Sequence, residues 1–252
     1  MSVNKTLPSM WIRPDWPAPA TVQAISTSRQ GGVSSAPWAS LNLGNHVDDS
    51  PEAVTRNRAI VRQYLPASPV WLTQVHGVQV ANAATAYQNT EADAITAHTA
   101  NAVCAVMTAD CLPVLLCNQA GTVVGAAHAG WRGLCNGVIE ATIRQMQTPA
   151  ETLMAWLGPA IGPDAFEVGD EVRTAFIAHD HRSTDAFKPS QNTGKWLADI
   201  YLLARQRLQA SGVNAIYGGN FCTVTDSERF FSYRRDQRTG RMASLIWLTD
   251  EC

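Results

Sequence analysis

Short apolar segments separated by turn-forming residues run along the chain and predict a buried sheet. Each segment has the length of a strand rather than of a helix. The predicted strands are residues 22–28, 69–75, 103–108, 112–117, 122–127, 153–157, 215–218, 229–232 and 243–248. Residues 118–121 (Asn-Gln-Ala-Gly) have the composition of a tight turn, so residues 112–117 and 122–127 are expected to form a hairpin.

Helical periodicity appears between these segments. Ser50 and Pro51 form a plausible N-cap and first position of a helix that runs to about Tyr64. Further helices are expected at residues 134–147, 169–178 and 198–209. Strands and helices alternate unevenly and include a tight hairpin, which favours mixed rather than purely parallel sheets. We therefore predict a single α/β (or α+β) domain spanning residues 1–252.

Composition narrows the class of protein. Hydrophobic residues make up 46% and charged residues 16% of the chain, as expected of a folded domain with a large core. The 19 basic and 21 acidic residues nearly cancel, which argues against nucleic-acid binding and against a membrane-surface patch. No signal-like or membrane-spanning apolar stretch is visible, and the six irregularly spaced cysteines do not resemble a disulfide framework. A cytoplasmic enzyme is the prediction.

The predicted hairpin brings two metal-binding residue types together. A symmetric closure pairs Cys117 with Thr122, and the same register extended outward places Cys111 opposite His128. Side chains that oppose each other in this way have Cβ atoms about 4.5–5.5 Å apart. This separation suits two ligands of one metal ion, or a Cys/His nucleophile pair. A bulge or an asymmetric loop would shift the register.

A catalytic zinc ion needs a third protein ligand and an open fourth position. His76, at the end of the predicted strand 69–75, is the leading candidate, because the remaining histidines lie in polar turns or at a helix end. Spacing alone does not establish His76 as a ligand. Asp93 is a candidate for orienting a histidine ligand, or equally a turn carboxylate.

Two further segments are candidates for binding an anion. Gly130 and Gly133 enclose Arg132 at a strand-to-helix turn, where backbone N–H groups favour a negative ligand. Alternatively, these glycines only let the helix pack against the strand. A group of arginines near the C-terminus could bind an anionic substrate or form a solvated face: Arg234, Arg235 and Arg241.

Three of these segments resemble the signature motifs of the laccase-domain, or YfiH-like, family. They are residues 73–77 (Thr-Gln-Val-His-Gly), 108–114 (Thr-Ala-Asp-Cys-Leu-Pro-Val) and 127–133 (Ala-His-Ala-Gly-Trp-Arg-Gly). Residues 28–34, 40–44, 158–162 and 231–235 support the resemblance in the same order along the chain. It implies a compact domain of mixed sheets sandwiched between helices, with His76, Cys111 and His128 as the ligands of a catalytic zinc ion.

The resemblance also implies an activity. Members of the family are described as purine nucleoside phosphorylases that split adenosine, inosine and sometimes methylthioadenosine with inorganic phosphate. Adenosine deamination is attributed to the same site. The expected substrate contacts are Arg29, Asn42 and Arg132.

Three alternatives stay open. Older descriptions call the family copper-dependent polyphenol oxidases, but six histidines are too few for a multicopper cluster, so copper would have to replace zinc in the same site. A metal-free cysteine hydrolase would use Cys111 as nucleophile and His128 as base. A non-enzymatic metal-binding module is the third alternative, although the chain has no C-x₂-C pair of the kind that structural zinc sites use.

Overall fold

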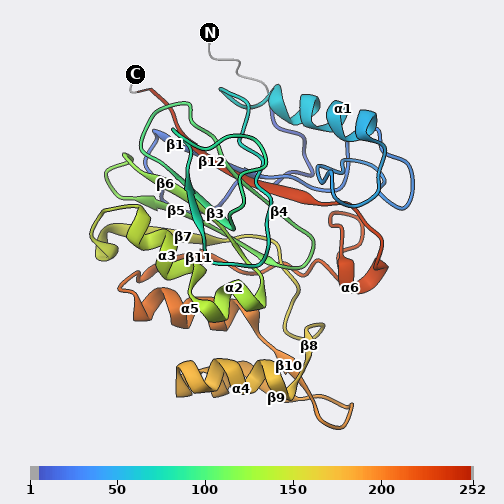
Figure 1. Ribbon diagram of the computed structural model, residues 1–252, viewed down its shortest axis with the longest axis vertical. Coiled ribbons are helices and arrows are strands. Elements are labelled where there is room, and N and C mark those ends of the chain that lie inside the picture. Colours follow the sequence, from blue (N-terminus) through green and yellow to red (C-terminus); the bar gives the residue numbers. More distant parts are fainter. Residues whose placement is uncertain (1–5, 251–252) are drawn as a thin grey trace.

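The computed structural model describes residues 6–250, in which two stacked β-sheets lie between helices (Figure 1). The larger sheet has the order β11-β7-β5-β6-β3-β2 and combines parallel with antiparallel pairs. Its strands are β2 (Val80–Asn82), β3 (Ala94–Ala97), β5 (Leu112–Asn118), β6 (Val124–Ala129), β7 (Leu153–Leu157) and β11 (Ala215–Gly218). The second sheet, β1-β12-β4, is antiparallel and consists of β1 (Val22–Ser26), β4 (Cys104–Thr108) and β12 (Met242–Leu248).

Helices cover the outer faces of both sheets. Helix α1 (Pro51–Arg62) lies beyond the three-stranded sheet, and α2 (Trp131–Asn136), α3 (Val138–Gln145) and α5 (Ile200–Ala210) lie beyond the six-stranded sheet (Figure 1). Helix α4 (Asp170–His179) packs with a small third sheet of order β8-β10-β9. That sheet consists of β8 (Glu167–Gly169), β9 (Phe187–Pro189) and β10 (Lys195–Ala198). The short helices are η1 (Ala150–Thr152), η2 (His181–Ala186) and α6 (Tyr233–Asp236).

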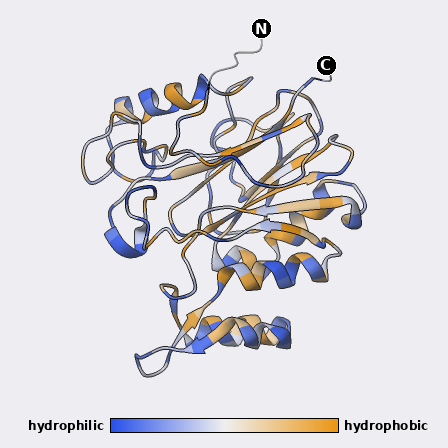
Figure 2. Cartoon of the chain, turned by 180° about the vertical axis from the view of Figure 1, so that it is seen from behind, coloured by the Kyte–Doolittle hydropathy of each residue, from blue (hydrophilic) through white to orange (hydrophobic). Residues whose placement is uncertain are grey.

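Alternation along the strands builds the core in layers. In β5, Leu112, Val114 and Leu116 pack towards the helices, whereas Leu115 and Cys117 pack between the sheets. The strands of the second sheet likewise send one set of residues into the space between the sheets and the other set towards α1. Figure 2 shows this pattern as mainly hydrophobic strands and two-sided helices. The predicted mixed α/β sandwich is confirmed.

The single-domain assignment to residues 1–252 remains a prediction, and residues 1–5 and 251–252 lie outside the described part of the chain. Within residues 6–250, the helices are too short or too polar to cross a bilayer.

Several predicted elements are confirmed. Ser50 caps α1 by accepting a hydrogen bond from Ala53 N, with Pro51 at the first helical position. Strands β7 and β11 have the predicted bounds. The predicted helix 134–147 is instead two helices, because Gly137 adopts a left-handed conformation with φ of 100°.

Two predicted strands were wrong. Residues 69–75 form only an isolated bridge between Thr73 and Glu91, and residues 229–232 form a loop that leads into α6. Residues 71 and 73 make backbone hydrogen bonds to residues 89–92, and residues 229 and 230 make single backbone hydrogen bonds to residues 29 and 226, but neither segment forms a continuous ladder. The small strands β2, β3, β8, β9 and β10 were not predicted, because segments this short carry little periodicity.

The predicted hairpin register was also wrong, by two residues. His128 lies opposite Pro113 rather than Cys111, and Cys117 lies opposite Val124 rather than Thr122. The loop lies one residue later than predicted, because Asn118 N donates to Val123 O at 3.3 Å and the Asn118 side chain caps the turn. Its Oδ1 atom accepts hydrogen bonds from the backbone N–H groups of Thr122 and Val123 at 2.9 and 3.2 Å. A shift of two residues preserves the face of every side chain.

Candidate metal centre

Two histidines and a cysteine from separate segments converge at one end of the six-stranded sheet. The ligand atoms of His76, Cys111 and His128 all lie within 4.8 Å of one another, and this is the one group of its kind among residues 6–250. Cys111 Sγ lies 3.8 Å from His76 Nε2, and the two imidazole rings meet edge to face with their centroids 4.8 Å apart. His128 is buried and His76 exposed, so the group is open on one side.

Asp110 turns the chain so that Cys111 joins this group. Asp110 has φ of 91°, a conformation that non-glycine residues adopt at a cost and that is concentrated at functional sites. Its carboxylate accepts hydrogen bonds from Thr223 Oγ1 and Arg234 N, each at 2.6 Å, and its carbonyl oxygen accepts one from Ile161 N at 2.9 Å. These contacts hold the strained turn in place just before β5 begins.

Asp93 holds both histidines. It is fully buried, and its Oδ1 atom accepts hydrogen bonds from His128 Nδ1 at 2.8 Å and from His76 N at 2.9 Å. Its Oδ2 atom accepts from Gly77 N at 2.6 Å and from Val75 N at 3.2 Å. Because Nδ1 of His128 is bound to Asp93, Nε2 is left for a ligand. This is the arrangement in which a carboxylate orients a metal-binding histidine.

Gln74 ties the His76 segment to the strand that leads to Cys111. Its amide donates to Met107 O at 2.8 Å and accepts from Met107 N at 2.7 Å, so the side chain imitates a strand pairing with β4. His76 itself has a left-handed backbone with φ of 61°. Sequence reasoning did not single out Gln74, although it stands within the motif at residues 73–77.

Gly130 keeps the centre of the group open. A Cβ atom at this position would lie 2.8 Å from His76 Cδ2 and 3.0 Å from Cys111 Sγ, too close for either. At Gly133 a Cβ atom would lie 2.8 Å from Gly77 O. The packing interpretation of these glycines therefore has direct support, and α2, which starts between them, is only six residues long.

The three side chains perturb one another electrostatically. Burial alone would raise the pKa of Cys111, but the charge of His128 and hydrogen bonds from both histidines outweigh it and lower the pKa to about 6. Burial alone would lower the pKa of His128, but Cys111 and Asp93 raise it to about 9. In the absence of a metal ion, a thiolate–imidazolium pair is the favoured state near neutral pH.

The residues present fit a zinc ion. Zinc takes imidazole nitrogen and thiolate sulfur as ligands, and catalytic zinc sites have three protein ligands and an open fourth position. Tetrahedral coordination places a thiolate sulfur and an imidazole nitrogen about 3.6 Å apart, and the observed separation of Cys111 Sγ and His76 Nε2 is 3.8 Å. The low pKa of Cys111 also favours the deprotonated ligand that a metal requires.

The three residues expected to contact the substrate differ in how many of their polar side-chain atoms are bonded to other parts of the protein. Arg29 donates from Nε to Ala39 O and from Nη1 to Ser227 O, and stacks on Phe231. Asn42 is fully buried, and its amide bonds Gly44, Asp49 and the backbone N–H of Arg241. Arg132 is exposed and stacks on Trp131. Among residues 6–250, no hydrogen bond or ion pair joins these three side chains to one another.

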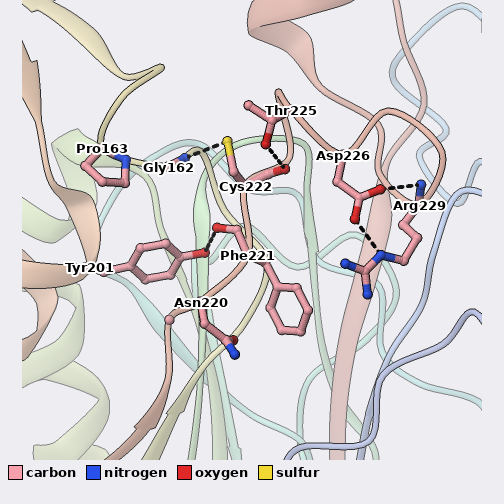
Figure 3. A pocket seen from close by; sticks show the side chains of 10 residues that line it. Gly162, Pro163, Tyr201, Asn220, Phe221, Cys222, Thr225, Asp226 and Arg229 are labelled. Atoms are coloured by element: carbon pink, nitrogen blue, oxygen red, sulfur yellow. Dashed lines mark hydrogen bonds and ion pairs between the residues drawn. The ribbon is translucent and has the colours of Figure 1, made fainter.

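A separate pocket of about 400 Å³ lies where residues 162–163 meet residues 219–229 (Figure 3). Its polar walls are paired internally: Cys222 Sγ accepts from Gly162 N at 3.3 Å, Tyr201 Oη donates to Phe221 O at 2.9 Å, and Arg229 forms an ion pair with Asp226. None of the metal-centre residues lines this pocket.

The chain belongs to the family described as multi-copper polyphenol oxidoreductase laccase, which matches residues 23–249. Its relatives are named for a different activity. A purine nucleoside phosphorylase of Pseudomonas aeruginosa is 56% identical over 240 residues, covering 95% of this chain and 99% of that protein. Purine nucleoside phosphorylase YfiH of Escherichia coli (strain K12) is 56% identical over 243 residues, with the same coverage.

A solved structure shares the fold. The crystal structure of a Neisseria meningitidis protein superimposes with a TM-score of 0.92 at 53% sequence identity, covering 95% of this chain and 99% of that chain. The resemblance to the YfiH-like family is thereby confirmed.

Proposed function

We propose that this protein is a zinc-dependent purine nucleoside phosphorylase with a secondary adenosine deaminase activity. The observation that carries the proposal is the convergence of His76, Cys111 and His128 on one open point, within a chain whose relatives carry the phosphorylase name. The substrates are adenosine, inosine or methylthioadenosine, together with inorganic phosphate. The five described cysteines are all free, which supports a reducing, cytoplasmic location.

His76, Cys111 and His128 would hold the zinc ion, which would supply Lewis acidity when bound. Neighbouring residues hold the three ligand side chains in position. Asp93 fixes the ring of His128, and Gln74 and Asp93 together fix the segment that carries His76. Gly130 leaves room at the centre of the group.

In phosphorolysis, a phosphate oxygen attacks C1′ of the ribose while the bond to the purine breaks and the base leaves with a proton. Within residues 6–250, the Arg132 guanidinium stacks on Trp131 and makes no hydrogen bond to protein, whereas Arg29 uses Nε and Nη1 for backbone carbonyl oxygens and keeps Nη2 for a ligand. Asn42 serves the site through its hydrogen bond to Arg241 N, which places that arginine.

The test is adenosine turnover by the zinc-loaded protein with and without phosphate, with products separated by chromatography. Adenine and ribose 1-phosphate should form only with phosphate, and inosine should form without it. Cys111→Ser and His128→Ala should lose both reactions, whereas Cys222→Ser, which changes a cysteine outside the centre, should keep both. Failure of the zinc-loaded protein to release adenine in the presence of phosphate would contradict the proposal.

Two other activities have a specific observation in their favour. A copper-dependent polyphenol oxidase is suggested by the family description and by the two-His, one-Cys donor set, which copper also accepts. A metal-free cysteine hydrolase is suggested by two hydrogen bonds, one between Cys111 and His128 and one between His128 and Asp93. In such an enzyme Cys111 would be the nucleophile, His128 the base and Asp93 the carboxylate that orients the base.

Metal analysis discriminates among these candidates and the non-enzymatic metal-binding module. Stoichiometric zinc with activity that chelation abolishes excludes the hydrolase. Oxidation of phenols that requires added copper favours the oxidase, and bound zinc without turnover of any nucleoside favours the module.

A further inference from the structure

Arg241 immediately precedes β12 and has a backbone held at both ends of its peptide unit. Arg241 N donates to Asn42 Oδ1 at 2.9 Å, and Leu43 N donates to Arg241 O at 3.1 Å. The guanidinium is also tethered at one corner, because Nη1 donates to the carbonyl oxygens of Thr239 and Gly240, each at 3.1 Å. The base of this side chain is therefore fixed.

The other side of the guanidinium has no hydrogen-bond or ion-pair partner among residues 6–250; the remaining contact is with the Tyr233 ring, whose centroid lies 5.9 Å from Arg241 Cζ. No described acceptor bonds Nε or Nη2 of Arg241, and none of the ion pairs in this part of the chain includes it. These nitrogens are not enclosed polar atoms either. A fixed arginine with two adjacent free N–H groups is the geometry that binds a phosphate oxygen pair.

His46 lies beside Arg241. A Cβ atom built on Gly44 would lie 2.9 Å from Arg241 Cγ and 3.4 Å from His46 Cε1, so the two side chains flank the same backbone position. Gly44 is itself clamped by Asn42, which accepts from Gly44 N at 2.9 Å and donates to Gly44 O at 3.0 Å. One fully buried asparagine thus holds the backbone of Arg241 and of the glycine that both side chains flank.

The fold brings Arg241 towards the segment that carries Cys111, because Met242, the residue after Arg241, pairs with Thr108 at the end of β4. The charges of Cys111 and Asp110 act on the Arg241 guanidinium, and the charge of His128 acts on the His46 imidazole. The Asp110 carboxylate does not pair with Arg241, since its oxygens accept from Thr223 Oγ1 and Arg234 N. Positive charge at Arg241 therefore remains available for an external anion.

We propose that Arg241 and His46 form the phosphate-binding subsite of the active centre, with Arg241 as the principal contact. The inference rests on the proposed phosphorolysis, but phosphate binding can be measured without turnover. Two phosphate oxygens accept hydrogen bonds from Nε and Nη2 of Arg241, and His46 donates one from its ring. Asn42 is the positioning residue, because it binds the backbone of Arg241 and of Gly44.

The experiment measures inorganic phosphate binding to the zinc-loaded protein by titration calorimetry, and separately the KM for phosphate and for inosine. Arg241→Gln should weaken phosphate binding about ten- to hundredfold, the loss expected for hydrogen bonds to a charged ligand. The KM for inosine and the zinc content should not change, and Arg241→Lys should recover part of the affinity. Arg238→Gln, which removes an exposed arginine three positions away, is the matched control and should bind phosphate as the unaltered protein does.

Each outcome decides the matter. If the protein binds phosphate through Arg241 but splits no nucleoside, the subsite stands and the proposed activity fails. If Arg241→Gln binds phosphate as tightly as Arg238→Gln, or if it raises both KM values equally, Arg241 is not the phosphate contact. Absence of phosphate binding by the unaltered zinc-loaded protein overturns the inference as well.

Discussion

Asp93→Asn tests the idea that one buried carboxylate organises the metal centre. The carboxylate accepts four hydrogen bonds, from His128 Nδ1 and from three successive backbone N–H groups at residues 75–77. An asparagine has a single acceptor oxygen, and its NH₂ group would face N–H donors where Oδ2 or Oδ1 stood. Two of the four donors then lose their acceptor beside a fully buried side chain.

The magnitude follows from this count. A fully buried donor without a partner costs about 1–3 kcal/mol, and the three backbone donors are only partly buried, so about 6 kcal/mol is the upper limit of the loss in free energy of unfolding. Loss of the carboxylate that orients His128 should also weaken zinc binding about 10–100-fold. Burial alone would raise the pKa of Asp93, but the hydrogen bonds from His128 and Gly77 outweigh it and hold the pKa below its ordinary value.

The assay combines urea unfolding of the metal-free protein with zinc competition against a chromophoric chelator. Asp226→Asn, which alters a carboxylate paired with Arg229 away from the centre, is the control and should leave zinc affinity unchanged. A less stable variant is still folded without urea, so its zinc affinity can be measured on the folded protein. The effect on zinc binding is thereby distinguished from the effect on stability. Unaltered zinc affinity in folded Asp93→Asn would refute the reasoning.

The remaining predictions concern the same centre. Gly130→Ala should abolish stoichiometric zinc binding, because its Cβ atom would crowd His76 and Cys111. Gly77→Ala, whose Cβ atom would have no contact closer than 3.4 Å, should retain zinc. Metal analysis of both proteins checks this. Gln74→Ala should speed hydrogen exchange at residues 73–77 and weaken zinc binding, and unchanged exchange there would contradict the strand-like role of its amide. In the metal-free protein, iodoacetamide should alkylate Cys111 with a rate that rises with pH through a midpoint near 6, since the thiolate forms above its pKa of about 6; a midpoint near 9, read by mass spectrometry, would contradict the coupling to His128.

The convergence of Cys111 and His128 could be predicted from sequence, although the register could not. The Asn118-capped loop moved the pairing by two residues, and an even shift returns each side chain to its expected face. Turn chemistry carried by one asparagine side chain has no signal in the hydrophobic pattern. The prediction that Cys111 and His128 lie close together therefore survived the change in the loop, whereas the prediction that they pair directly across the hairpin did not.

The position of His76 could not be derived in the same way. The segment before it is not a strand, and His76 reaches Cys111 because its backbone is left-handed and because Asp93 and Gln74 hold the neighbouring residues. These are contacts between segments 17 and 33 positions apart. Motif resemblance supplied what periodicity did not.

The proximity of Arg241 and His46 also results from contacts between distant segments, which the sequence pattern does not reveal. It depends on Asn42, whose side chain joins a loop near the N-terminus to the start of β12, 199 positions later. In the sequence, Arg241 stands among other arginines and His46 stands in a polar turn. Only the fold distinguishes Arg241 from Arg235, whose guanidinium is already bound to the carbonyl oxygens of residues 223, 224 and 230 and to a neighbouring aspartate.

X-ray absorption at the zinc edge of the purified, zinc-loaded protein tests the central claim most directly. The account predicts one ion per chain with one sulfur at about 2.3 Å and two imidazole nitrogens at about 2.0–2.1 Å, and with the sulfur signal absent in Cys111→Ser. A coordination shell made only of oxygen and nitrogen atoms in the unaltered protein, or a sulfur signal that survives in Cys111→Ser, would contradict it.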